Sequence, residues 1–361
     1  MKTILLNPGP VTLSRRVRDA MLRPDLCHRE PEFGALQEGL RRKLLAVYAS
    51  DPERWAPVLL TGSGTAAVEA MLTSLVPSHG RVLIVENGVY GERMTQIARA
   101  HGLPHQHVTA AWSAPIELAT VERALRSAAF THIAVVHHET TTGRLNDLDG
   151  LAALARTHGA RLLIDAVSSF GAEAIRLDDW CVDGCAATAN KCLHGVPGAA
   201  FVLVRRAALS STEQRTVYLD LTAHLARQDV GSTPFTHAVQ AFYAWDEALD
   251  EFAEEGGLWA RRALFRTRMG RISERLRACG VAPLLRDDET SCVLRSFRLP
   301  PNHGYAALHY RLKQEGFVIY AGQGSLSGDI FRVSAMGDIG EKDLTRLLDA
   351  FSTALAEPLG Q

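Results

Sequence analysis

Between about residues 56 and 205 the chain alternates two kinds of segment, and this alternation most constrains its fold. The strand-like apolar runs are APVLLTG, RVLIVEN, THIAVVHHE, ARLLIDAVS and AAFVLVRR. Amphipathic helical stretches lie between several of them, at 64–76, 91–101, 115–127 and 147–157. Strands made almost wholly of Val, Ile and Leu are typical of parallel sheets covered by helices on both faces. The pattern therefore predicts the α/β fold class with a mostly parallel sheet.

The segments on either side of this region predict further helices and a second unit. The chain has 361 residues, enough for one large domain and a smaller one. Helical patterns are expected over 34–48, 238–256, onward to about 280, 304–315 and from 340. We expect an N-terminal arm over residues 1–15, a large α/β domain over 16–240 and a small C-terminal α+β domain over 241–361.

Charge and hydropathy restrict the partners of the chain. Lys and Arg number 39 against 40 Asp and Glu, and no basic tract exceeds a triplet, so neither nucleic acid nor an anionic membrane surface is expected. Pro8 and Pro10 interrupt the N-terminal apolar run, and no stretch reaches the ~18 apolar residues of a membrane span. The six cysteines form no CxxC and match no common zinc spacing. We expect a cytoplasmic protein with reduced cysteines and no metal site.

A glycine-rich turn, TGSGTAAVEA, follows the first predicted strand. Gly62 and Gly64 let backbone N–H groups approach an anion, and Ser63 and Thr65 add hydroxyls at a helix N-terminus, where the dipole favours phosphate. The same letters fit a dinucleotide-binding turn, but the nearest acid at a later strand end, Glu86, lies in the unrelated context NGVYG. We therefore expect a phosphate cradle, with a plain tight turn as the alternative.

Two further strand exits carry side chains suited to a flat ligand. Tyr90 lies between glycines in NGVYGERM, where its ring either stacks on a cofactor or packs as an ordinary tyrosine. The threonines of HHETTTG either donate to a ring oxygen or satisfy the turn. His137 and His138 precede them, and histidines at strand ends are more often structural than catalytic.

An acid and a lysine complete the pattern. Asp165 ends the apolar run of LLIDAVSSFG, and Lys191 lies in ATANKCLHGVPG, which has no other acidic or basic residue except a histidine. Asp165 supplies the anion that keeps a pyridine nitrogen protonated. Lys191 supplies an amine that forms a Schiff base and carries a proton once released, and burial lowers the pKa of such a lysine.

These motifs, in this order, resemble the class V, fold-type I pyridoxal 5′-phosphate (PLP) aminotransferases over nearly the whole chain. The matching stretches are NPGP, TGSGTAAVEA, NGVYGERM, HHETTTG, IDAVSSFG, ANKCLHGVPG and FRVSAMGD. Within that family, ETTTG, DAVSSFG, NKC, GVPG and GFVIY resemble the branch of 2-aminoethylphosphonate–pyruvate transaminases. The resemblance implies PLP as cofactor, an amine and a keto acid as substrates, and a homodimer with shared active sites.

The resemblance also implies a role for individual residues. Lys191 binds the cofactor covalently, and Asp165 pairs with its ring nitrogen. Tyr90 stacks on the ring, Thr140 donates to the ring hydroxyl, and Arg332 in FRVS grips the anionic end of the substrate, a task suited to the guanidinium fork. The contacts to the cofactor phosphate fall on Ser63, Gly64 and Thr65, and on Thr233 of the other subunit.

One stretch departs from that branch. CHREPEF, residues 27–33, resembles serine or alanine aminotransferases instead. Its Arg29 fits a second cation for a phosphonate dianion, and it equally fits a different amino donor. Because the other motifs resemble the phosphonate branch, we still expect transamination between 2-aminoethylphosphonate and pyruvate, in either direction. The alternatives are an alanine–glyoxylate or serine–pyruvate type aminotransferase, a transaminase for a related aminophosphonate, and, from another class, a nucleotide-binding oxidoreductase.

Overall fold

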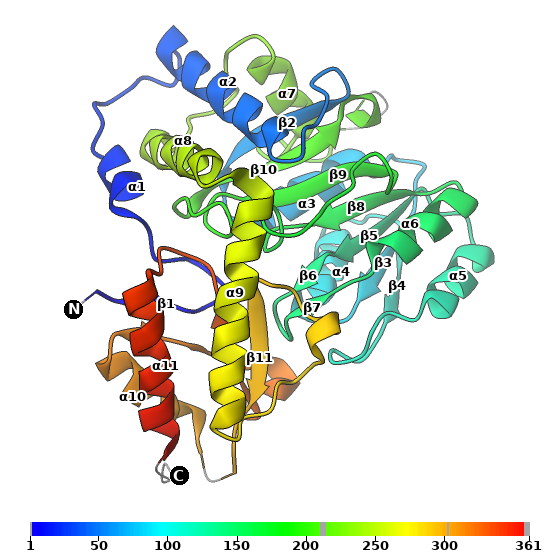
Figure 1. Ribbon diagram of the computed structural model, residues 1–361. Coiled ribbons are helices and arrows are strands. Elements are labelled where there is room, and N and C mark those ends of the chain that lie inside the picture. Colours follow the sequence, from blue (N-terminus) through cyan, green and yellow to red (C-terminus); the bar gives the residue numbers. More distant parts are fainter. Residues whose placement is uncertain (1, 210–213, 302, 357–361) are drawn as a thin grey trace.

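A seven-stranded sheet lies at the centre of the computed structural model, which describes residues 2–209, 214–301 and 303–356 (Figure 1). Its strands run in the order β2-β10-β9-β8-β5-β3-β4. Strand β10 is antiparallel to both neighbours, and every other neighbouring pair is parallel, which confirms the predicted class. The bounds are Trp55–Gly62 for β2, Val82–Glu86 for β3, His105–Thr109 for β4, His132–Val136 for β5, Arg161–Asp165 for β8, Val182–Thr188 for β9 and Gly198–Arg205 for β10.

Strands β4 and β9 have no counterpart among the predicted runs. Strand β4 lies at the edge of the sheet, and its sequence HQHVT is polar because none of its residues is buried. Strand β9 is buried throughout but consists mostly of small residues, VDGCAAT. A Cβ atom at Gly184 would lie 2.4 Å from Leu75 Cδ1, so the small residues let helix α3 (Gly64–Leu75) pack closely on the sheet.

Helices cover both faces of the sheet, and alternate residues of a strand belong to opposite faces. In β3, Val82 and Ile84 share a core with α3, α4 and α7, whereas Leu83 and Val85 share a core with α2, α5, α6 and α8. The bounds are Pro31–Ala46 for α2, Val89–Ala100 for α4, Leu118–Ser127 for α5, Leu148–Thr157 for α6, Leu221–Gln228 for α7 and Val239–Glu254 for α8.

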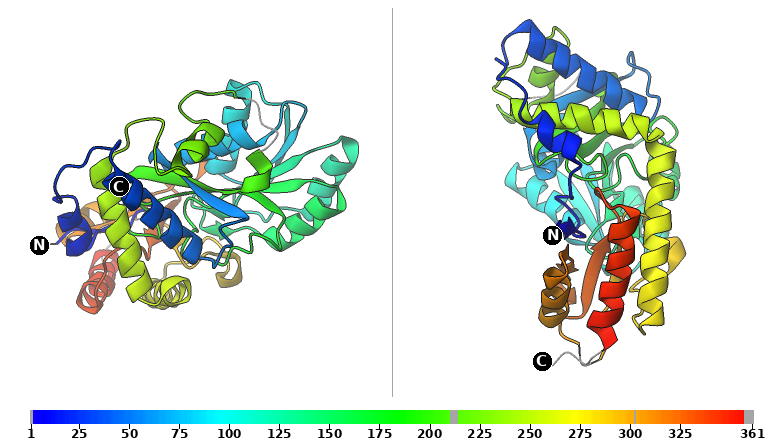
Figure 2. Two further views of the ribbon diagram at one scale, coloured as in Figure 1. Left: turned by 90° about the horizontal axis from the view of Figure 1, so that it is seen from above. Right: turned by 60° about the vertical axis from the view of Figure 1, so that its left-hand side comes forward.

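A three-stranded antiparallel sheet, β11-β14-β13, forms a second unit with its own core. Helix α11 lies beside α9 on this unit (Figure 2). The N-terminal Ile4 and Leu6 belong to the same core, because β1 pairs in parallel with β12. The bounds are Ile4–Leu5 for β1, Gly257–Ala278 for α9, Leu294–Arg298 for β11, Tyr305–Gln314 for α10, Phe317–Val318 for β12, Tyr320–Ala321 for β13, Ile330–Ser334 for β14 and Glu341–Ala356 for α11.

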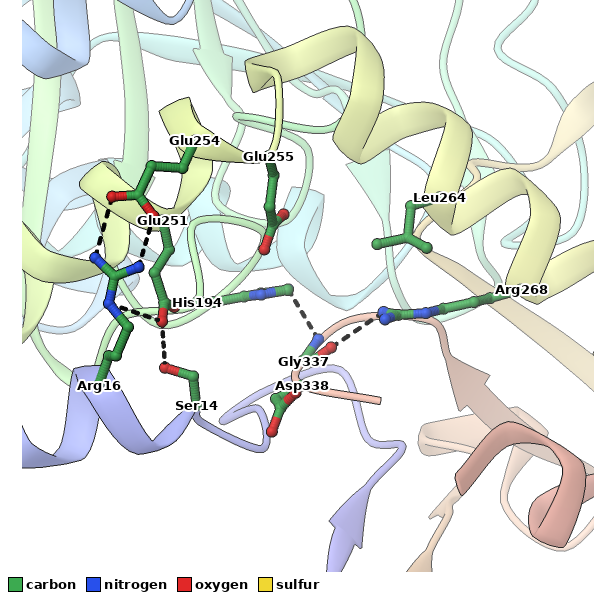
Figure 3. A pocket seen from close by; sticks show the side chains of 10 residues that line it. All are labelled: Ser14, Arg16, His194, Glu251, Glu254, Glu255, Leu264, Arg268, Gly337 and Asp338. Atoms are coloured by element: carbon green, nitrogen blue, oxygen red, sulfur yellow. Dashed lines mark hydrogen bonds and ion pairs between the residues drawn. The ribbon is translucent and has the colours of Figure 1, made fainter. Parts of the chain in front are cut away.

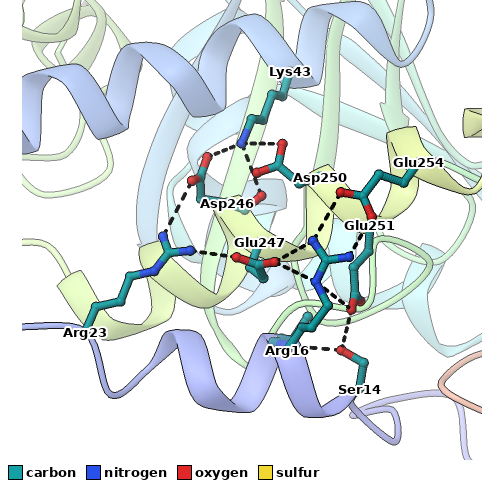
Figure 4. A network of polar contacts seen from close by, with 10 residues as sticks. Ser14, Arg16, Arg23, Lys43, Asp246, Glu247, Asp250, Glu251 and Glu254 are labelled. Carbon is teal, nitrogen blue, oxygen red and sulfur yellow. Dashed lines mark hydrogen bonds and ion pairs between the residues drawn. The ribbon is translucent and has the colours of Figure 1, made fainter.

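Helix α8 packs on the large sheet. Its Phe242 and Trp245 are buried in the core that also contains Phe201 of β10. Charged residues tie α8 to helix α1 (Arg15–Ala20) and to α2, as Figure 4 shows: Arg16 pairs with Glu247 and Glu254, and Lys43 pairs with Asp246 and Asp250. Among the described helices, none is long and apolar enough to cross a membrane.

Candidate active site

The cavity beyond the carboxyl ends of the sheet strands gathers four of the predicted site residues. Gly64, Thr65, Tyr90 and Asp165 line it together with Arg93 and Val167. They come from the turn after β2, the first turns of α3 and α4, and the end of β8. Strands that run in parallel present their carboxyl ends at one edge of a sheet, which is where ligands of α/β proteins bind.

The turn after β2 places an anion-binding helix end at this cavity. Ser63 caps α3, and its Oγ accepts a hydrogen bond from the backbone N–H of Ala66 at 3.4 Å. A Cβ atom at Gly64 would lie 2.7 Å from Val167 Cγ1, so this position has no room for a side chain. The first N–H groups of a helix lack partners within the helix, and together with the Thr65 hydroxyl they suit a phosphate group.

Asp165 is a buried carboxylate on this cavity. Its Oδ1 accepts a hydrogen bond from the backbone N–H of Val167 at 3.0 Å. Burial raises the pKa of Asp165 to about 6, while the Val167 bond and the charges of Arg93 and Lys191 act in the opposite direction. A cationic partner favours the ionised form, so the position suits a protonated ring nitrogen.

Lys191 lies in the turn that follows β9, and the N-terminal arm holds its amine. The Nζ atom donates to the backbone oxygen of Pro8. A Cβ atom at Gly9 would lie 2.6 Å from Nζ, so the NPGP stretch packs directly on the lysine. Burial lowers the pKa of Lys191 to about 8, which makes the neutral amine accessible near physiological pH.

The guanidinium of Arg332, on β14, is fully buried and one of its nitrogens has no partner. Nε donates to the backbone oxygen of Ala321 at 2.9 Å, and Nη1 donates to the backbone oxygen of Thr140 at 3.0 Å and to Gln323 Oε1 at 3.2 Å. Nη2 forms no hydrogen bond. Burial lowers the pKa of Arg332. A buried charge with an unpaired donor is costly, so this group suits an anionic ligand.

Arg29 and Thr233 lie together, away from this cavity. Arg29 is exposed, and its Nη1 donates to the backbone oxygen of Thr233 at 2.9 Å. Thr233 is fully buried, and its hydroxyl donates to the backbone oxygen of Phe235 at 3.0 Å. Neither residue lines the cavity formed by Tyr90 and Asp165 within the same chain. The role of Thr233, which concerns the other subunit, and the role of Arg29 as a second cation for the substrate therefore stay predictions.

Arg93 also lines the cavity and was not among the predicted site residues. Its guanidinium lies 5.2 Å from the centre of the Tyr90 ring, and Nη1 lies 3.5 Å from Thr65 Oγ1. The sequence could have indicated it, because Arg93 lies three residues after the candidate Tyr90, and residues three apart on a helix share a face.

His137 and His138 prove to be buried in hydrogen-bonded positions. His137 Nδ1 lies 3.0 Å from Ser169 Oγ, and His138 Nδ1 lies 3.2 Å from the backbone oxygen of Ser168. Burial lowers the pKa of each ring to about 4, so both are neutral at physiological pH. This favours the structural interpretation of both histidines.

A separate polar pocket of about 320 Å³ lies behind the lysine turn (Figure 3). His194, three residues after Lys191, adopts a positive φ of 61°, and its Nε2 accepts a hydrogen bond from the backbone N–H of Gly337 at 2.8 Å. Arg268 donates to the backbone oxygens of Ala335, Gly337 and Ile339. The His194 bond holds the lysine turn against the segment that follows β14, and the Arg268 bonds hold the same segment against α9. These contacts indicate a structural role for this pocket.

The residues on and around the cavity of Tyr90 and Asp165 fit PLP. The α3 N-terminus offers an anion site, Gly64 leaves space that a Cβ would fill, Asp165 is a carboxylate in need of a cation, and Lys191 is a lysine with a lowered pKa. Across residues 2–209, 214–301 and 303–356, no group of three or more His, Cys, Asp or Glu side chains is arranged to hold a metal ion.

Comparisons with known proteins identify relatives of this chain. The family model of class V aminotransferases matches residues 25–336. A 2-aminoethylphosphonate–pyruvate transaminase of Vibrio vulnificus is 38% identical over 363 residues, covering 98% of this chain and 97% of the relative. One of Bacillus cytotoxicus is 37% identical over 360 residues, covering 97% of each.

Solved structures show the same fold. A subgroup IV aspartate aminotransferase of Thermus thermophilus is 29% identical, with a TM-score of 0.90 over 99% of this chain and 100% of that one. An alanine–glyoxylate aminotransferase of Nostoc sp. is 28% identical, with a TM-score of 0.91 over 98% of this chain and 96% of that one. These matches overturn the oxidoreductase alternative: the chain belongs to the class V aminotransferases and is a PLP-dependent enzyme of fold-type I.

Proposed function

We propose that this enzyme transfers the amino group of 2-aminoethylphosphonate to pyruvate, giving phosphonoacetaldehyde and alanine, and that it acts in either direction. The observation that carries the substrate assignment is the 38% identity over nearly the full length to transaminases of that name. The buried guanidinium of Arg332, with its unpaired Nη2, supports it because both substrates carry an anionic group.

Each predicted cofactor-binding residue has a task in this proposal. When bound, PLP supplies a carbonyl group and an electron sink for the transamination. The α3 N-terminus, with Ser63 and Thr65, binds its phosphate, and Asp165 holds a proton on its ring nitrogen. Tyr90 covers one face of the ring, and Thr140 donates to its hydroxyl. These side chains would thus hold the ring on several sides.

Lys191 is the proton carrier in the proposed mechanism. Because burial lowers its pKa to about 8, Nζ loses its proton readily near neutral pH. The neutral amine then accepts a proton from the carbon that bears the donor amino group. Pro8 and Gly9 confine the amine close to the cavity.

Arg332 binds the acidic group of each substrate in turn. The phosphonate of the amino donor and the carboxylate of pyruvate bind to the same guanidinium in separate half-reactions. Because one guanidinium cannot bind both groups at once, the substrates act one after the other, in a ping-pong order. The bonds to Ala321, Thr140 and Gln323 fix the plane of the guanidinium before the substrate arrives.

We also propose a cytoplasmic homodimer in which Arg29 and Thr233 of one subunit complete the site of the other. Exposed apolar side chains near Thr233 support this assembly, since Val230 is 73% exposed and Tyr218 is 41% exposed. In it, Arg29 provides a second cation for the phosphonate.

The packing of α8 supports a later boundary between the large and the small unit than residue 240. We propose that the large unit extends to Gly256, where the chain turns into α9, because α8 lies on the core of the large sheet. In the same way, we assign Ile4 and Leu6 of the N-terminal arm to the core of the small unit.

A second candidate function is an alanine–glyoxylate or serine–pyruvate type aminotransferase, favoured by the stretch CHREPEF. A transaminase for a related aminophosphonate is a variant of the first proposal. A half-reaction distinguishes them: purified enzyme with bound PLP is mixed with 2-aminoethylphosphonate and no keto acid, while the cofactor spectrum is recorded. Conversion of the cofactor to its amine form, reversed by pyruvate, supports the proposal. Conversion by alanine or serine but not by 2-aminoethylphosphonate rejects it in favour of the second candidate.

A further inference from the structure

Glu139 is a buried carboxylate close to the cavity that the proposed mechanism does not use. It ends the short strand β6 (His138–Glu139), immediately before Thr140, and its side chain is 0% exposed. In the described part of the chain, no Lys or Arg forms an ion pair with it. Burying a carboxylate without a cation costs free energy, and hydrogen bonds must offset that cost. The presence of Glu139 at this position therefore indicates that its hydrogen bonds serve a purpose in the site.

The two carboxylate oxygens of Glu139 are bonded to two different segments. Oε1 accepts from the backbone N–H of Thr141 at 3.1 Å and from the Thr141 hydroxyl at 2.6 Å. Oε2 accepts from the backbone N–H of Tyr90 at 3.3 Å. Burial raises the pKa of Glu139 to about 7, and the bonds from Thr141 and Tyr90 act in the opposite direction, which means that they favour the ionised form.

These bonds complete the N-terminus of α4. The first N–H groups of a helix have no partners within it, and the cap residue of α4, Gly88, has no side chain to offer. The N–H of Val89 donates to Thr141 Oγ1 at 3.2 Å, and the N–H of Tyr90 donates to Glu139. The turn 139–141 therefore supplies the cap that α4 lacks, and it puts a carboxylate at the positive end of the helix dipole.

The contact between this turn and α4 leaves no spare space. A Cβ atom at Gly88 would lie 2.2 Å from Glu139 Cδ. The φ of Gly88 is 172°, an extended value open to any residue, so the close approach of the carboxylate is what requires glycine here. The start of α4 is thus held against Glu139 by packing as well as by hydrogen bonds.

The same turn lies between two groups of the proposed site. On one side it holds Tyr90, which lines the cavity with Asp165. On the other side the backbone oxygen of Thr140 accepts from Arg332 Nη1 at 3.0 Å. A shift of this turn would therefore move the stacking ring.

We propose that Glu139 is a positioning residue that caps α4 from outside the helix and thereby holds the Tyr90 ring against the face of the cofactor. The proposal rests on the role given to Tyr90 in the proposed function. It predicts that Glu139 affects cofactor binding through Tyr90 and not independently of it.

The test is a double-mutant cycle on the affinity of the cofactor-free protein for PLP, measured by absorbance titration. The variants are Glu139→Gln, Tyr90→Leu and the two together. Glu139→Gln keeps the shape but replaces one acceptor by an amide N–H₂ that faces a donor. We expect it to weaken PLP binding about two- to tenfold, the range expected for losing aromatic stacking. In the Tyr90→Leu background it should weaken binding no further.

Glu173→Gln is the matched control, because Glu173 is also buried but bonds to Ser291, Cys292 and Arg262, away from this cavity. Two results overturn the proposal: losses that multiply in the double variant, or a loss in Glu139→Gln no larger than in the control. A wild-type protein that fails to bind PLP would overturn the cofactor role of the cavity itself, and this proposal with it.

A second pair of variants keeps the test decisive if Glu139→Gln does not fold. Thr141→Val removes the hydroxyl that joins Glu139 to the N–H of Val89, whereas Thr141→Ser keeps it. We expect weaker PLP binding in the valine variant and near-normal binding in the serine variant. Equal, unchanged binding in both variants would contradict the proposed cap.

Discussion

At the scale of single residues, Lys191 is the most decisive position. Lys191→Ala removes the amine that Pro8 and Gly9 hold in place. We expect turnover to be abolished while PLP is still held by its phosphate and ring contacts. Steady-state rates and cofactor retention after gel filtration measure the two effects separately. Normal turnover in this variant would overturn the role of Lys191.

Asp165 links pH to the stability of the cofactor-free protein. Its pKa is raised from 3.8 to about 6, so the protonated form favours the folded state, and that contribution is lost as pH rises from about 4 through 6. The difference corresponds to about 3 kcal/mol.

We therefore expect cofactor-free Asp165→Asn to be more stable than the cofactor-free wild type at pH 8, and the gap to close near pH 4. Turnover of the loaded variant should fall by orders of magnitude, because the ring nitrogen loses its anionic partner. Thermal melting of both cofactor-free proteins across this pH range checks the first expectation, and a gap independent of pH would contradict it.

Arg332 should control the affinity for anionic substrates. Because its guanidinium is buried and Nη2 is unpaired, we expect Arg332→Ala to weaken binding of both 2-aminoethylphosphonate and pyruvate by roughly 2–5 kcal/mol. KM values for the two substrates provide the measurement. Unchanged KM values for both would remove Arg332 from the site.

At the scale of elements, the junction of β2 and α3 depends on one missing side chain. Gly64→Ala puts a Cβ atom 2.7 Å from Val167 Cγ1, at the helix end proposed to bind phosphate. We expect overpacking to cost about 1–3 kcal/mol and to weaken PLP binding. Combining it with Val167→Ala should restore much of the stability. Chemical denaturation of the three variants tests this, and an equal loss in the double variant would show that the contact with Val167 is not the cause.

At the scale of the whole molecule, the proposed sharing of sites predicts complementation. A mixed dimer of Lys191→Ala and Arg29→Ala subunits contains one site with both changes and one site with neither. Mixing the two inactive or weakened proteins under conditions of subunit exchange should therefore raise activity at low 2-aminoethylphosphonate.

The control for this experiment pairs Lys191→Ala with Asp165→Asn, two residues that serve the same cavity of one chain. No mixed dimer of that pair has an intact site, so no activity should return. No recovery in the test pair would place Arg29 in its own subunit's site or outside any site. Recovery in the control would show that the regained activity does not report sharing of sites between subunits.

Strands and helices with clear local patterns were predictable, and those shaped by distant contacts were not. The Val, Ile and Leu runs predicted β3, β5 and β8, and the helical spacing predicted α3 and α8, because a buried strand or a one-sided helix leaves its pattern in a short window. Strand β4 was missed because an edge strand tolerates polar residues, and β9 was missed because close packing of α3 demands small ones.

The sequence alone determined the chemistry of this protein, and the tertiary structure decided its arrangement. The order of the motifs was enough to predict the family and the cofactor, and the residue types of Asp165, Lys191 and Arg332 suit the roles proposed for them. The cap on α4 from Glu139, the closeness of Arg93 to Tyr90, and the unpaired Nη2 of Arg332 appeared only in the folded chain. Hydrogen bonds and burial join residues far apart in sequence, and no local pattern records which partners will meet.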